Sequence, residues 1–181
     1  ILERLMNSQI TIKKIQDLLL EGLQTTHVDD ETSRRMWWAS LEVIQKEFLS
    51  RNYQEGGIWI ASPLPALNEK KFFNKLQGWL LSPEGFPYFK KKYAGFLPGN
   101  HTKSIRGNSE FSSNYRVLNL NPKDGYEPFL MIITPNFQCI LTIAGEKDKK
   151  ILLMRCDEES LKNVIELIHI KFNQENYYEG L

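Results

Sequence analysis

The feature that most constrains the fold is a series of short apolar runs in the last third of the chain. Each run is rich in Ile, Leu and Val, and Pro, Gly, Asn and Asp residues separate the runs. They occupy residues 115–120, 129–134, 138–144 and 150–155. Runs of this length between turn residues predict β-strands, and such short connections join antiparallel neighbours. We therefore expect a β-meander from residue 115 onward, followed by a closing helix that Asp157 caps.

Helical periodicity predicts three helices upstream of these strands. The first has its apolar residues at Ile12, Ile15, Leu19 and Leu23. The second starts at Asp29 or Asp30, and its stripe contains Trp37, Leu41, Ile44 and Phe48, widened by Met36 and Val43. The third follows a short strand at 58–61 and an Asn68 cap, and buries Phe72, Leu76, Trp79 and Leu80. Spacings of three and four residues place each set on one helix face.

These elements predict an α+β fold: a mainly antiparallel sheet packed by helices, with an N-terminal helical pair and a C-terminal helix after the β-meander. We expect an N-terminal helical segment for signalling or dimerisation at 1–27, a sensory α+β domain at 28–173 and a tail at 174–181. The chain starts at Ile1 rather than Met and shows no signal-peptide pattern, so we expect it to be part of a longer protein. No apolar run approaches the roughly 20 residues that cross a bilayer.

Several stretches of the sequence resemble the DICT sensory domain, which occurs in diguanylate cyclases and two-component proteins, especially in cyanobacteria. They are the helix around Ala39-Ser40-Leu41, the strand Ile58-Trp59-Ile60-Ala61-Ser62, the aromatic pair Phe72-Phe73, the lead-in Asn119-Leu120-Asn121-Pro122-Lys123-Asp124 and the Asp157 cap. The resemblance covers roughly residues 32–172. Residues 82–114 depart from it, because the family has a clear strand there and this sequence has none.

Membership would imply a non-enzymatic input module of a bacterial signalling protein that biases an attached output domain of kinase or cyclase type. It would imply no catalytic residue and no cofactor. We expect a ligand or protein partner to favour one packing of the N-terminal helices on the sheet, and these helices could also form a homodimer.

The most unusual local composition lies at residues 86–96, where aromatic residues lie on both sides of three consecutive lysines. The candidate ligand or partner contacts are Tyr88, Phe89, Lys90, Lys91, Lys92 and Tyr93, together with His101 and Arg106 in the following loop. Interleaved cations and rings can bind single-stranded nucleic acid, or the rings can pack in the core while the lysines stay in water. The net charge of the chain is only +1, which argues against nucleic acid and favours a protein partner or an acidic ligand.

The remaining candidates are tryptophans and cysteines. Trp37, Trp59 and Trp79 could line a pocket for a flat ligand, and core packing explains the same residues. Cys139 and Cys156 lie in predicted strands, where we expect small buried hydrophobes in a reducing, cytoplasmic compartment rather than a disulfide, a metal site or a reactive thiol. The three histidines have no metal-ligand spacing, so we expect no metal site.

Overall fold

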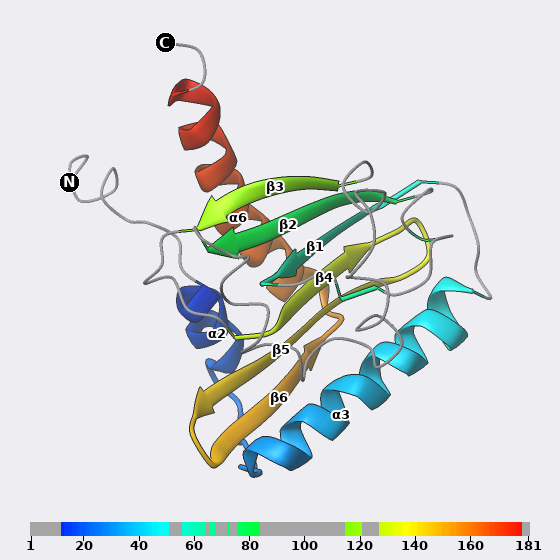
Figure 1. Cartoon of the computed structure of the whole chain (residues 1–181), viewed down its shortest axis with the longest axis vertical. Helices are drawn as coiled ribbons and strands as arrows, with labels where there is room; N and C mark the ends of the chain where they lie inside the picture. The colour runs from blue at the N-terminus through cyan, green and yellow to red at the C-terminus, as the bar shows by residue number, and fades with distance from the viewer. Residues whose placement is uncertain are drawn as a thin grey trace, which may run out of the picture.

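The computed structural model is one mixed β-sheet with helices on both faces (Figure 1). The structure describes residues 12–50, 56–63, 66–67, 72, 76–83, 115–120 and 127–178. Its helical elements are α2 (Ile12–Leu20), α3 (Asp30–Val43), the π-helix η1 (Ile44–Leu49) that continues α3, and α6 (Glu158–Tyr178). Its strands are β1 (Ile58–Ser62), β2 (Gln77–Pro83), β3 (Tyr115–Leu120), β4 (Phe129–Ile133), β5 (Gln138–Glu146) and β6 (Lys149–Arg155).

The sheet has the strand order β3-β2-β1-β4-β5-β6. The pairs β1–β2 and β2–β3 are parallel, whereas β1–β4, β4–β5 and β5–β6 are antiparallel. Antiparallel pairing therefore dominates, and α6 follows the last strand. The predicted α+β fold, with a mainly antiparallel sheet and a C-terminal helix after the meander, is confirmed.

Side-chain caps start two of the helices where the sequence predicts them. The Thr32 N–H donates a hydrogen bond of 2.7 Å to Asp29 Oδ1 at the start of α3. The Ser160 N–H donates a hydrogen bond of 2.9 Å to Asp157 Oδ1 at the start of α6. Each bond satisfies a backbone donor that has no partner inside its own helix. Asn68, the predicted cap of a third helix, lies outside the described residues.

The predicted third helix is wrong at its C-terminal half, because residues 77–83 form strand β2. Trp79 and Leu80, assigned to one helix face, point to opposite faces of the sheet. This strand lies between β1 and β3 and buries side chains on both faces. Such a strand reads as a continuous apolar run, which periodicity alone does not distinguish from a buried helix segment.

The predicted meander is also too long by one strand. Residues 115–120 form β3 at the far edge of the sheet, where they pair in parallel with β2. Strands β2 and β1 separate β3 from β4, so the meander consists of β4, β5 and β6 only. Consecutive strands are neighbours only about two-thirds of the time, and here the free edge of β2 provides the partner for β3.

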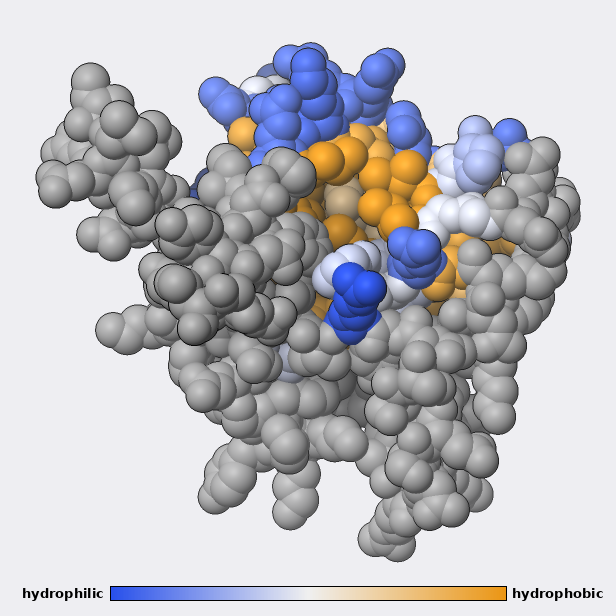
Figure 2. Space-filling view, turned by 90° about the horizontal axis from the view of Figure 1, so that it is seen from above, coloured by the Kyte–Doolittle hydropathy of each residue, from blue (hydrophilic) through white to orange (hydrophobic). Residues whose placement is uncertain are grey.

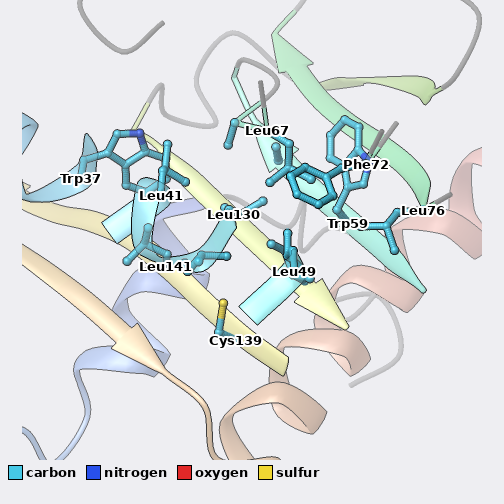
Figure 3. Packing of buried hydrophobic residues seen from close by; sticks show 14 of the residues in the cluster. Trp37, Leu41, Leu49, Trp59, Leu67, Phe72, Leu76, Leu130, Cys139 and Leu141 are labelled. Carbon is cyan, nitrogen blue, oxygen red and sulfur yellow. The ribbon is translucent and has the colours of Figure 1, made fainter. Parts of the chain in front are cut away.

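Two hydrophobic clusters lie on the two faces of the sheet. Cluster 1 lies between the sheet and α3–η1 and includes Trp37, Leu41, Trp59, Leu130 and Cys139 (Figure 3). Cluster 2 lies on the other face, where α2 and α6 contribute Ile12, Ile15, Leu19, Leu161, Val164 and Ile168. The two N-terminal helices thus follow one another in sequence but pack on opposite faces of the sheet.

The connection between these helices runs past the edge strand β6. Val28 and Lys150 exchange two backbone hydrogen bonds of 2.8 Å, which form an isolated antiparallel bridge. The bridge pairs part of a strand edge that would otherwise present free backbone groups. It also fixes the point at which the chain passes from the α2 face to the α3 face.

The predicted apolar stripes are wider than the buried ones. Leu23, Met36, Val43 and Phe48 were all assigned to helix stripes, and each is exposed. Leu23 lies beyond the end of α2. On α3 the sheet covers only the narrow row of Ser33, Trp37 and Leu41. Phe48 lies on η1 and stacks on Phe137, with ring centroids 4.4 Å apart. A single sheet face therefore buries less of the helix than the sequence pattern predicts.

Candidate functional site

The predicted lysine and aromatic contacts lie outside the described residues. These are Tyr88, Phe89, Lys90, Lys91, Lys92, Tyr93, His101 and Arg106. Their assignment as ligand or partner contacts stays a prediction.

The three tryptophans named as pocket candidates do not come together. Trp37 and Trp59 belong to cluster 1, where they are 2% and 0% exposed. Trp79 lies on the opposite face of the sheet, partly buried against cluster 2. Trp37 and Trp59 therefore serve as packed core, whereas Trp79 is partly exposed.

Trp79 belongs to a surface that the strand register builds from four strands. Gln77 and Ile133 both pair with Ile58, so these three form one row across β2, β1 and β4. Trp79 pairs with Arg116 of β3 in the adjacent row. Side chains that are two residues apart on a strand share a face, so all five lie together. We call Ile58, Gln77, Trp79, Arg116 and Ile133 the open surface.

The open surface combines apolar and cationic character. Ile58, Trp79 and Ile133 are partly exposed, whereas Gln77 and Arg116 are exposed. The Arg116 guanidinium carbon lies 5.0 Å from the centroid of the Trp79 ring, within the range of a cation–π interaction. Viewed from above, the described part of the molecule exposes hydrophobic residues among hydrophilic ones (Figure 2). Within that part, no carboxylate forms a salt bridge with Arg116.

A buried amide holds α2 on the same face of the sheet. Gln16 Nε2 donates hydrogen bonds to Thr142 Oγ1 at 3.1 Å and to the Ile143 carbonyl at 2.8 Å. Thr142 Oγ1 in turn donates a hydrogen bond of 2.7 Å to the Pro128 carbonyl. These hydrogen bonds form only when α2 has one particular orientation and position on the sheet, because a shifted helix would leave the buried amide without partners. Hydrophobic contacts alone would allow α2 to pack in more than one position on the sheet.

The sequence contains a signal for Gln16 that apolar residues alone do not reveal. Ile12, Ile15 and Leu19 lie at i, i+3 and i+7, and Gln16 occupies i+4 of the same stripe. A polar residue at that position is a candidate for a buried hydrogen bond. Arg116 carries no comparable signal, because its neighbour Trp79 comes from a strand 37 positions earlier in the sequence.

The cysteines differ from each other. Cys139 is buried, as predicted, whereas Cys156 is exposed, so its prediction as a buried hydrophobe is wrong. Cys156 follows the last residue of β6, where the chain turns toward α6 and the sheet no longer covers it. Burial raises the pKa of the Cys139 thiol to about 12, and the nearby Cys156 thiol adds to the rise. The pKa of Cys156 is raised by partial burial and by the charge of Asp157.

The described ranges contain neither a cluster of metal ligands nor a membrane-spanning helix. No three His, Cys, Asp or Glu side chains gather there closely enough to hold a metal ion. Among the helices described, none is both long and apolar enough to cross a bilayer.

Comparison with known proteins gives one match. The model of a family described as a domain of unknown function (DUF8628) matches residues 13–181. This range begins at the second residue of α2 and includes all of the other described elements. No curated protein and no solved structure matches the chain.

Proposed function

Because the chain belongs to the DUF8628 family, whose function is unknown, its function must come from its own geometry, and we propose that it is a non-enzymatic regulatory input domain. A protein partner binds at the open surface, and binding changes how α2 packs on the sheet. The attached output domain, of kinase or cyclase type, responds to the position of α2. The resemblance to the DICT sensory domain supports a bacterial signalling context.

One observation carries the proposal: cluster 2 joins the open surface to α2. Trp79 and Ile133 of the open surface pack against this cluster, and the same cluster contains the whole buried apolar stripe of α2. Packed side chains have few alternative arrangements, so a partner that moves Trp79 changes the space available to α2. The link needs no catalytic group.

The helix α2 is suited to respond because it is small. It has nine residues, and helices of this length are marginal in water on their own. Three buried aliphatic side chains and the Gln16 amide fix it to the sheet and α6. A modest change in free energy therefore shifts the balance between docked and released helix.

The open surface determines the chemistry of the partner segment. Arg116 would pair with a carboxylate, while Ile58, Trp79 and Ile133 would accept aliphatic side chains. We therefore propose a segment that carries an acidic residue next to apolar ones. An arginine held over an aromatic ring is suited to this task, because the guanidinium can bind a planar carboxylate with two parallel hydrogen bonds.

A photoreactive residue at Gln77 tests the proposal in cells that contain the natural full-length protein. The crosslinked partner is identified, purified and added to the protein, and hydrogen exchange of residues 12–20 is measured. We expect the partner to change this exchange by about tenfold or more in the wild type. The variant Arg116→Glu should lose the effect.

The matched control is Lys147→Glu, which makes the same charge change at an exposed lysine in the β5–β6 turn. This variant should respond to the partner as the wild type does. A partner that binds but leaves the exchange of residues 12–20 unchanged would contradict the role of α2. Crosslinking that persists in Arg116→Glu would contradict the role of the open surface.

A double-mutant cycle measures how strongly the amide holds α2. Gln16→Leu removes the donor, Thr142→Val removes one acceptor, and both changes nearly preserve shape. Gln16→Leu should lower the free energy of unfolding by about 1–3 kcal/mol, because Ile143 loses a buried donor to its carbonyl. We expect a coupling energy of about 1 kcal/mol between the two sites, measured by urea unfolding of all four proteins. A coupling energy of zero would show that the hydrogen bond does not position α2.

A further inference from the structure

The register of β5 and β6, extended by one position, places the two cysteines of the chain opposite each other. The ladder ends at the pair of Ile140 and Arg155, and one further step beyond this pair leads to Cys139 and Cys156. Directly opposite residues of an antiparallel pair point to the same face, with Cα atoms about 4.5–5.5 Å apart. A disulfide spans Cα separations of about 4.4–6.8 Å. A pair that continues this ladder by one step has the Cα separation that a disulfide requires.

The surroundings of the two thiols differ and determine which thiol is oxidised first. Cys139 lies at the rim of cluster 1 and has no exposed surface (Figure 3). Cys156 is exposed, so a dissolved oxidant reaches it first. The raised pKa values of both thiols keep them protonated near neutral pH, which makes this first step slow. The pair is thus suited to sustained oxidation rather than to rapid turnover.

We propose that Cys139 and Cys156 form a reversible cross-strand disulfide when the protein meets a peroxide. The Cys156 sulfur attacks one peroxide oxygen, the O–O bond breaks, and Cys156 becomes a sulfenic acid with release of water. The Cys139 sulfur then attacks the Cys156 sulfur, the S–O bond breaks, and the Cys139 proton leaves with the hydroxide as a second water. Two thiols are oxidised and one hydrogen peroxide is reduced to two water molecules.

The bond would act on the junction between the sheet and α6. Cys156 directly precedes Asp157, whose carboxylate accepts the Ser160 N–H at 2.9 Å and the Arg155 Nε–H at 2.9 Å. A link from β5 to Cys156 would fix the first turn of α6 to the sheet. Because the link also closes a chain loop in the unfolded state, we expect the melting temperature to rise by about 5 °C.

Treatment of the full chain with hydrogen peroxide tests the proposal. The expected product is a monomer whose mass is lower by two hydrogens, with no titratable thiol and a peptide pair joined through Cys139 and Cys156. Dithiothreitol should restore both thiols and the original melting temperature. The exposed-site variant Cys156→Ser should keep its buried thiol and show no rise in melting temperature.

A second variant, Cys139→Ala, separates the bond from simple oxidation of the exposed thiol. Without its partner, Cys156 should proceed to the sulfinic acid or capture added glutathione, and either adduct is visible by mass. If wild-type protein gives the same adducts, or dimers linked through Cys156, instead of the internal bond, the proposal is overturned. Formation of the bond with an unchanged melting temperature would overturn its effect on the α6 junction.

Discussion

Replacing Trp59 with alanine should lower the free energy of unfolding by about 3–5 kcal/mol, the range for truncating a large buried aromatic residue. Trp59 has no exposed surface and lies near Phe72 and Leu76 in cluster 1, which also contains Leu67 from the segment after β1 and Leu49 from η1 (Figure 3). Its removal leaves a cavity among side chains from separate elements, which cannot all move inward to fill it. Urea unfolding followed by circular dichroism measures the change.

Trp79→Ala is the matched control for this prediction. The same atoms are removed, but from a partly exposed side chain at the open surface. This variant loses part of its apolar contact and the interaction with Arg116, so we expect a cost of at most about 2 kcal/mol. If Trp59→Ala costs no more than Trp79→Ala, Trp59 does not act as packed core, and a ligand pocket around it becomes the better interpretation.

The contrast between these tryptophans shows what the sequence can predict and where it stops. The start of α3 was predictable because Asp29 and Thr32 interact within one helical turn. The strands β4, β5 and β6 were predictable because turn residues separate their apolar runs. Each of these signals is local. The prediction of a helix at Trp79 is wrong because the partners of Trp79 are distant in sequence. Ile60 lies on β1 and Arg116 on β3, and both strands pair in parallel with β2.

The candidate site depends on the same non-local pairing. The open surface contains residues from four strands, and only the strand order places Arg116 next to Trp79. No local signal predicts this order, because residues 84–114 separate β2 from β3, and β4 bypasses both strands to pair with β1. The alignment of the two cysteines, by contrast, depends on a local connection. Strands β5 and β6 form a hairpin, so the register of Cys139 and Cys156 depends only on the short turn between them.

Replacing Ile15 with aspartate should release α2 from the sheet. Ile15 has no exposed surface, and a carboxylate in its place would be buried in cluster 2 without a cation. An unpaired buried charge costs several kcal/mol, more than a nine-residue helix gains by docking. We expect hydrogen exchange of residues 12–20 to increase by about 100-fold or more, and the free energy of unfolding to fall by about 3 kcal/mol. Exchange detected by mass spectrometry measures the first effect, and urea unfolding the second.

Lys13→Asp places the same residue on the exposed side of α2 and should leave exchange close to that of the wild type. The comparison also decides whether α2 and the open surface are coupled. If cluster 2 connects them, releasing α2 in Ile15→Asp changes the packing around Trp79, and partner crosslinking through position 77 should change at least severalfold. Coupling free energy is reciprocal, so a partner that alters α2 must bind differently when α2 is released. Released α2 with unchanged crosslinking would separate the two features and leave the open surface as a binding site without a transmitter.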